Sequence, residues 1–126
     1  MNHQPAGLVI EDDINLAEIF SQALSMAGYT PKIIHNGQKA LEHLENEIPH
    51  LIILDLNLPE VNGEAILSHL QQDDRFEETV VIVATANGTW GDMLHERANL
   101  VLEKPISFMQ LTNICQRFLA QIEAKN

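Results

Sequence analysis

The chain alternates between short runs of apolar residues and longer segments in which apolar residues recur at every third or fourth position. A continuous short run is typical of a strand buried on both faces, whereas the longer period is that of an amphipathic helix. The run Val80–Ala84 is the richest in β-branched residues, so we expect it to form a central, buried strand. In all, the apolar runs predict strands at Leu8–Ile10, Thr30–His35, Leu51–Leu54, Val80–Ala84 and Leu100–Leu102.

Helical patterns fill the segments between these strands. Asp13 can cap a first helix and Gly28 can end it, and its apolar face consists of Leu16, Phe20, Leu24 and Ala27. Further helices are predicted over Ala40–Ile48, closed by Pro49, over Glu64–Gln72, briefly around Asp92–Ala98, and after a capping Ser107. The last helix has an apolar stripe made of Phe108, Leu111, Ile114 or Cys115, Phe118, Leu119 and Ile122.

The order of these elements indicates the class of fold. Strands that alternate with helices imply a parallel sheet, because each helix carries the chain back to the edge where the previous strand began. Right-handed crossovers then give a doubly wound α/β sandwich of five βα units, with helices on both faces. No linker, internal repeat or low-complexity segment interrupts the pattern, so residues 1–126 are expected to form one domain.

Residues with reactive or ligating side chains follow four of the predicted strands. Glu11 and Asp12 follow the first strand, Asp55 the third, Thr85 the fourth and Lys104 the fifth. Parallel strands present their carboxyl ends at one edge, where ligands bind in open α/β sheets, so these side chains should converge. Taken by itself, Asp55 could equally well be a polar residue that merely ends a strand and has no function. Chance scatter of acids onto loops does not explain why each group follows a separate buried strand.

The predicted cluster has the composition of a phosphoryl-transfer site. Three carboxylates in one pocket repel one another, and a bound divalent cation would relieve that repulsion. Ligation by oxygen alone favours Mg²⁺, and no Cys/His cluster points to zinc. The dispersed histidines are expected to be mainly solvated. A cation and a lysine beside one aspartate would neutralise a transferring phosphoryl group while the carboxylate oxygen attacks it.

Composition narrows the classes of partner. Asp and Glu number 18 against 7 Lys and Arg, which gives a net charge of −11. This charge repels nucleic acid and anionic membranes, so neither is an expected partner. The single cysteine, Cys115, excludes an internal disulfide and falls in an apolar helical pattern that favours a buried structural thiol. No segment has the length and apolarity of a membrane span or the pattern of a signal peptide, so we expect a cytoplasmic protein.

Over nearly its whole length, the chain resembles the receiver domains of two-component response regulators. The resemblance is carried, in order, by Leu8–Asp13, by Leu54–Pro59 with Gly63, by Val83–Ala86 and by Glu103–Pro105. It implies a flavodoxin-like fold with strand order 2-1-3-4-5. It further implies a signalling protein, not an enzyme, which acts with a histidine kinase or phosphotransfer protein and with a downstream effector domain or protein. A second copy of the chain is a further candidate partner.

The resemblance also implies a role for each residue that follows a strand. Asp55 would be the phosphoacceptor, phosphorylated in a Mg²⁺-dependent reaction. Glu11 and Asp12 would form the acidic pair, with Asp12 binding the metal directly. Asp55 would be a further metal ligand, as would the backbone carbonyl of Asn57. Thr85 would donate a hydrogen bond to the phosphoryl group and Lys104 would pair with it.

Two departures from the family pattern concern the switch. Val101 stands where the family often has an aromatic residue, so no ring can flip there. The segment from Thr85 to Lys104 is short for the family and contains Gly88 and Gly91, so the fourth helix should be brief or loose. Ala86–Ala98 is therefore expected to be the segment that responds to phosphorylation. Trp90, in this segment, would pack over the short helix or anchor a partner.

Two alternative functions remain open at this stage. A pseudo-receiver would bind partners without switching, and acyl-phosphate formation would distinguish it. A flavin-binding protein or an enzyme of the same fold is the other, but acids occupy the position where such proteins have a phosphate-binding loop.

Overall fold

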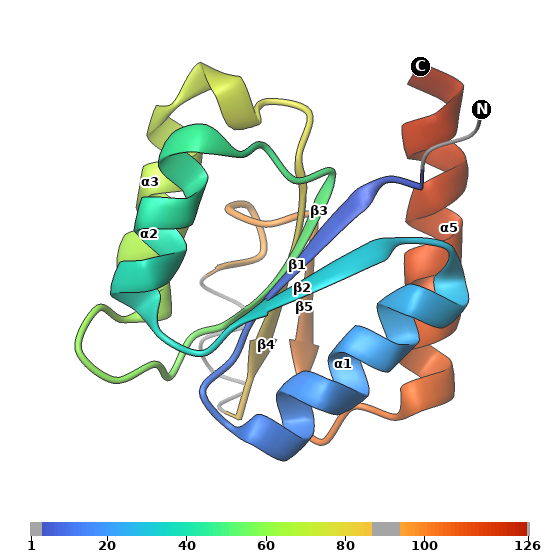
Figure 1. Cartoon of the computed structure of the whole chain (residues 1–126), viewed down its shortest axis with the longest axis horizontal. Coiled ribbons are helices and arrows are strands. Elements are labelled where there is room, and N and C mark those ends of the chain that lie inside the picture. Colours follow the sequence, from blue (N-terminus) through green and yellow to red (C-terminus); the bar gives the residue numbers. More distant parts are fainter. Residues whose placement is uncertain (1–3, 87–93, 126) are drawn as a thin grey trace.

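The core of the protein is a five-stranded parallel sheet (Figure 1). A computed structural model describes residues 4–86 and 94–125. The strand order is β2-β1-β3-β4-β5, as predicted. The fourth predicted strand is buried at all six positions, although it lies second from one edge and not at the centre of the sheet. The strands span Ala6–Ile10 (β1), Thr30–Ile34 (β2), Leu51–Asp55 (β3), Val80–Thr85 (β4) and Leu100–Glu103 (β5).

Helices cover both faces of the sheet, as the alternating pattern predicted (Figure 1). On one face lie α1 (Ile14–Ala27) and α5 (Phe108–Lys125), and on the other lie α2 (Gly37–Asn46) and α3 (Gly63–Gln72). The side chains of β3 alternate between the two resulting cores: Ile52 and Leu54 pack with α2 and α3, whereas Leu51 and Ile53 pack with α1 and α5. All five residues of β3 are buried, so this strand is the centre of the molecule.

The helix ends follow local rules that the sequence already carries. Asp13 caps α1 by accepting a hydrogen bond from Leu16 N at 3.0 Å, and Gly28 ends the helix in the left-handed region with φ of 110°. Ser107 accepts a hydrogen bond from Gln110 N at 2.9 Å and so caps α5, as predicted. Asn36 and Asn62 cap α2 and α3 in the same way.

The prediction for the end of α2 was wrong. The helix ends at Asn46, and Ile48 lies beyond it with 50% of its surface exposed. Pro49 disfavours helical backbone at the residue before it, so the chain is extended before the proline and Ile48 leaves the apolar stripe. Residues 92–93 of the short fourth helix expected around Asp92–Ala98 lie outside the described residues; in the described part, Leu94 is helical and residues 95–97 form turns.

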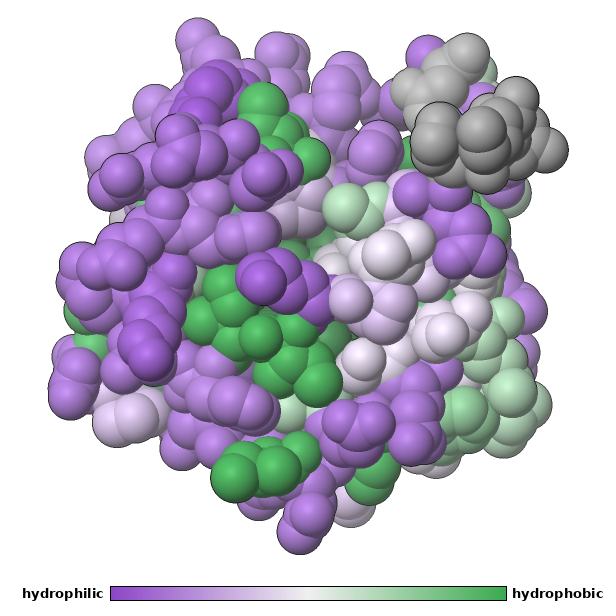
Figure 2. All heavy atoms as spheres, in the orientation of Figure 1, coloured by the Kyte–Doolittle hydropathy of each residue, from purple (hydrophilic) through white to green (hydrophobic). Residues whose placement is uncertain are grey.

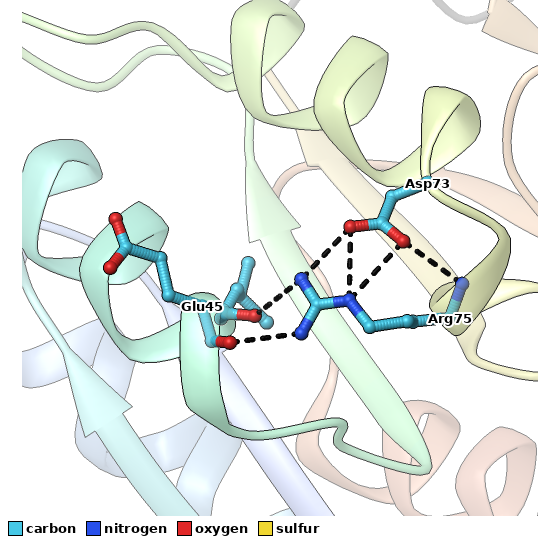
Figure 3. A network of polar contacts seen from close by, with 4 residues as sticks. Glu45, Asp73 and Arg75 are labelled. Atoms are coloured by element: carbon cyan, nitrogen blue, oxygen red, sulfur yellow. Dashed lines mark hydrogen bonds and ion pairs between the residues drawn. The ribbon is translucent and has the colours of Figure 1, made fainter.

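Arg75 joins the end of α2 to the connection between α3 and β4 (Figure 3). It belongs to a short 3-10 helix, η1 (Asp74–Phe76). Its guanidinium donates hydrogen bonds to the carbonyl oxygens of Leu44, at 3.1 Å, and Glu45, at 2.9 Å. A cation is favoured at this position because the last carbonyls of a helix carry partial negative charge. The carboxylate of Asp73 accepts hydrogen bonds from the same guanidinium and so fixes its position.

The surface is mainly hydrophilic on the side that shows β2 and α1, with apolar areas among the charged ones (Figure 2). β2 is an edge strand, and Thr30 N donates its hydrogen bond inward to Pro5 O, so the nitrogen of Pro31 faces the open edge. A proline there removes a free donor that could otherwise pair with a foreign strand. Among the described residues, no helix is long and apolar enough to cross a membrane.

Cys115 is buried in the core between α1 and α5, as the apolar pattern predicted. Burial raises the pKa of its thiol to about 12, so the thiol stays protonated near neutral pH. Its backbone oxygen accepts a 2.8 Å hydrogen bond from the hydroxyl of Tyr29. The cysteine therefore has a structural place in the α1–α5 packing.

We predict that Gly63→Ala destabilises the protein strongly. A Cβ at this position would collide with the backbone oxygen of Asp55 and would lie 2.6 Å from Leu56 Cα. Backbone cannot move aside as a side chain can, so we expect a loss of about 1–3 kcal/mol in the free energy of unfolding, measured by urea denaturation.

Gly7→Ala is the matched control for this substitution. Its Cβ would meet two methyl groups of Leu24 at 3.0 and 3.3 Å, and a leucine side chain can adjust. A loss below about 1 kcal/mol is expected for the control. If both variants lost the same free energy of unfolding, close contact between the start of α3 and the backbone of Asp55 would not be what requires glycine at position 63.

Candidate functional site

Four strands deliver polar side chains to one edge of the sheet. Strand register sets Ile10 opposite Leu54, and Asp55 opposite Ala84, so the residues that follow β1 and end β3 and β4 meet at that edge. One carboxylate oxygen from each of Glu11, Asp12 and Asp55 lies within 4.8 Å of the others. Glu11 and Asp55 are buried, with 1% and 2% of their surface exposed, whereas Asp12 is exposed.

Lys104 is the cation of this cluster. Its Nζ lies 2.9 Å from Glu11 Oε1 and 3.2 Å from Asp55 Oδ1. Its backbone N donates a 2.7 Å hydrogen bond to the carbonyl oxygen of Thr85 at the end of β4. The lysine thus connects the ends of β1, β3 and β4 just after β5, and the peptide bond to Pro105 that follows is cis.

Asp55 is held by its own loop as well as by Lys104. The backbone N of Asn57 donates a 3.1 Å hydrogen bond to Asp55 Oδ1, which turns the chain directly after the strand. The preceding peptide group, between Asp55 and Leu56, still belongs to the sheet, because Leu56 N donates a hydrogen bond to Ala84 O at 3.2 Å. The side chain of Asn57 is exposed, whereas Leu56 and Leu58 are buried and anchor the loop. Asp55 is therefore fixed between a rigid strand and an anchored loop.

Burial and crowding shift the proton affinities within the cluster. Burial raises the pKa of the Glu11 carboxyl to about 7; the hydrogen bond from Lys104 opposes the rise and the charge of Asp55 adds to it. Burial lowers the pKa of Lys104, but its hydrogen bond to Glu11 and the charge of Asp55 outweigh burial and raise it. Lys104 is therefore protonated near neutral pH, whereas Glu11 is only partly ionised.

The donor set fits a hard divalent cation. Three carboxylates face one lysine, so the cluster has excess negative charge. Mg²⁺ prefers such ligands and keeps several waters, for which the exposed side of Asp12 gives room. An open pocket of about 590 Å³ adjoins the cluster, and its walls are formed by Asp12, Leu56, Asn57, Leu58, Pro59, Asn62, Glu64 and Leu94.

Thr85 ends β4 beside this cluster and has 1% of its surface exposed. Val101 is half-buried against the core on the α2–α3 side and pairs with Val83 across the sheet. Trp90, Gly88 and Gly91 lie outside the described residues, as does most of Ala86–Ala98. The expectations for a loose segment and for the place of Trp90 therefore remain predictions.

Sequence reasoning missed the part that histidines take in the structure. His35 Nδ1 lies 2.9 Å from the backbone oxygen of Glu11, and His50 Nδ1 accepts a 3.1 Å hydrogen bond from Ala6 N. His69 is half-buried, with its ring centroid 6.0 Å from that of Phe76. His35 and His50 are exposed, as expected, although each ring contacts a backbone atom, whereas His69 is half-buried and the expectation of solvation is wrong for it. No local signal could have found these contacts, because each joins segments brought together only by the sheet or by helix packing.

The comparisons with known proteins agree with this geometry. The family model of the response regulator receiver domain matches residues 8–116. The probable methanogenesis regulatory protein FilR2 of Methanothrix harundinacea is 30% identical over 115 residues, which cover 82% of this chain and 74% of FilR2. The response regulator Rre1 of Synechocystis sp. is 28% identical, over 94% of this chain and 53% of Rre1.

A solved structure extends the similarity to three dimensions. The crystal structure of the signal receiver domain of a protein described as a Luxo repressor, from Vibrio parahaemolyticus, superposes with a TM-score of 0.86 at 31% identity. The superposition covers 97% of this chain and 95% of that one. With the sheet order, the acidic cluster and the lysine after β5 in place, the chain belongs to the receiver domain family of response regulators.

Proposed function

We propose that this chain is a phosphoacceptor switch, in which Asp55 receives a phosphoryl group from a phosphohistidine of a histidine kinase or phosphotransfer protein. The observation that carries the proposal is the position of Asp55: a carboxylate with 2% exposure, bound by Lys104 and crowded by two further acids at the end of a buried strand. A structural aspartate would need a partner, but it would not need two more carboxylates beside it.

The proposed reaction moves one phosphoryl group. An oxygen of the Asp55 carboxylate forms a bond to phosphorus, the phosphorus–nitrogen bond breaks, and the departing imidazole takes up a proton. Lys104 stays beside Asp55 and pairs with the negative charge of the phosphoryl oxygens. Thr85, at the neighbouring strand end, donates a hydrogen bond to the phosphoryl group once it is attached. The result is an aspartyl phosphate at the edge of the sheet.

The metal-binding role falls to the acidic cluster. Asp12 is the direct ligand, since it is the exposed member, together with Asp55 and the backbone carbonyl of Asn57. Glu11 lies behind them, where its carboxylate bonds Lys104. Bound Mg²⁺ supplies positive charge that offsets the charge on the phosphoryl oxygens.

Phosphorylation would change partner binding by adding nearly two negative charges beside Lys104 and Thr85. The output goes to an effector domain or protein, and the chain spans about half the length of Rre1, so the activity of a whole regulator is itself part of this proposal. Pseudo-receiver function is the second candidate. It is favoured by Val101, which offers no aromatic ring to couple the site to the surface.

We predict that Mg²⁺ stabilises the protein through this cluster. A ligand that binds only the folded state, at about ten times its dissociation constant, adds about 1.4 kcal/mol to the free energy of unfolding. For a chain of this size that corresponds to a rise of about 4 °C in Tm, measured by a thermal melt with and without millimolar Mg²⁺. Asp12→Ala should abolish the rise, and Glu42→Ala, which removes an exposed acid on α2, should keep it. An unchanged rise in Asp12→Ala would place the metal elsewhere.

We predict that Asp55 is the residue modified by acetyl phosphate. With Mg²⁺ present, the labelled protein should gain one phosphoryl group by intact mass, and hydroxylamine should remove it because an acyl phosphate is a mixed anhydride. Asp55→Asn should show no labelling, since an amide cannot attack, whereas Asp74→Asn, an exposed acid in η1, should label as the parent does. Labelling that persists in Asp55→Asn would refute the assignment; a protein that never labels would favour the pseudo-receiver.

A further inference from the structure

His35 lies directly after β2, and its ring contacts the backbone of Glu11, the residue directly after β1. The two strands run in register as far as Ile10 opposite Ile34. Beyond that pair, Glu11 N still donates a hydrogen bond to Ile34 O at 3.1 Å. Because β2 ends at Ile34, no further residue of that strand is placed to donate a hydrogen bond to the carbonyl of Glu11.

The imidazole of His35 supplies that donor. Its Nδ1 lies 2.9 Å from the backbone oxygen of Glu11. A carbonyl oxygen can only accept, so Nδ1 must carry a proton, and the neutral ring is the Nδ1–H tautomer. A side chain thereby extends the hydrogen bonding between β1 and β2 by one step past the end of the strands.

This contact completes the fixation of Glu11. Its carboxylate accepts hydrogen bonds from Lys104 Nζ at 2.9 Å and from Asp13 N at 3.2 Å. With the backbone N–H bonded to Ile34 and the carbonyl bonded to His35, both peptide groups of Glu11 are oriented. The second of these peptide groups leads into Asp12. The Asp12 side chain is exposed, so this peptide group, which sets the position of its Cα and Cβ, is the fixed base from which the carboxylate reaches the cluster.

The corner that carries His35 is itself rigid. Asn36 caps α2 by accepting a hydrogen bond from Lys39 N at 3.1 Å. Gly37 is buried against the loop that follows Asp55, where an added Cβ would collide with the backbone oxygen of Val61. Residues 35–37 thus touch Glu11 on one side and the Asp55 loop on the other. The cap at Asn36 and the close contact of Gly37 fix the backbone of this corner, from which the exposed His35 side chain reaches Glu11.

We propose that His35 is a positioning residue for the metal site: its imidazole orients the Glu11–Asp12 peptide, and so the acidic pair, for Mg²⁺. This rests on the proposed function of the cluster. His35 reaches the backbone and not the phosphoryl group, so it acts on the affinity for Mg²⁺ and not on the chemical reactivity of Asp55 once the metal is bound.

The test compares a substitution that removes the donor with one that keeps it. Loss of one hydrogen bond in His35→Ala should weaken Mg²⁺ binding roughly fivefold by isothermal titration calorimetry. In His35→Asn the side-chain amide nitrogen can take the position of Nδ1, so the affinity should return to within about twofold of the parent. His95→Ala, an exposed histidine outside the site, is the control and should bind as the parent does.

A second readout separates positioning from general stability. At saturating Mg²⁺, the rate of labelling by acetyl phosphate should be the same in His35→Ala as in the parent, although the Mg²⁺ concentration for half-maximal rate should rise roughly fivefold. Parent-like Mg²⁺ affinity in a folded His35→Ala protein, or a His35→Asn protein as weak as His35→Ala, would overturn the proposal.

The contact can also be tested in the parent protein alone. Two-bond proton–nitrogen NMR correlations above pH 8 should show His35 as the Nδ1–H tautomer, and the Nε2–H tautomer would overturn the proposal even if His35→Ala failed to fold. A parent protein that binds no Mg²⁺ but shows the Nδ1–H tautomer would refute the proposed function, and with it this role, while leaving the His35–Glu11 contact intact.

Discussion

The ion pairing of Lys104 with Glu11 and Asp55 is the constraint on which the site depends. Two carboxylates with 1% and 2% exposure would repel each other strongly at the end of a buried sheet. One ammonium lies within 3.2 Å of an oxygen of each, and it comes from a residue 93 positions away from Glu11 in the chain. Removing one partner of such a buried cluster leaves charge uncompensated, which costs far more than the pair itself contributes.

The surrounding structure holds that arrangement from several directions. β3 is buried throughout and packs into both cores, so the position of Asp55 cannot change without disturbing both. Gly63 lets α3 begin in contact with the backbone of Asp55. Gly37 lets the corner between β2 and α2 approach the loop that follows Asp55. Further from the site, Arg75 ties the end of α2 to η1. A rigid frame of this kind suits a reaction in which the protein contributes orientation and charge more than covalent chemistry.

The acidic cluster keeps negative charge that Lys104 does not offset. Lys104 offsets one negative charge among three carboxylates, and the raised pKa of Glu11 shows that burial and repulsion are not fully relieved. Lys104 also bonds the carbonyl of Thr85 through its backbone, so the ends of β4 and β5 are joined. In the proposed switch, a new charge at Asp55 would act on both of these strand ends.

The sequence determined the layered fold and the residues of the cluster, because both follow from local regularities. Apolar runs and helical periods set the order of elements, and parallel strands must bring Glu11, Asp55, Thr85 and Lys104 to one edge whatever their detailed packing. The helix caps at Asp13 and Ser107 could be predicted for the same reason, because each cap contacts a residue within one helical turn.

Contacts between distant segments were decided by the tertiary structure alone. The bonds from Arg75 to the end of α2 and from His35 to the carbonyl of Glu11 span about 30 and 24 positions and leave no periodic trace in the chain. Ile48 leaves its helix although it fits the apolar spacing, because the backbone before Pro49 overrides it. The sequence determines which groups reach the edge of the sheet, whereas packing across the fold decides their orientation, because side-chain directions depend on neighbours that only folding brings together.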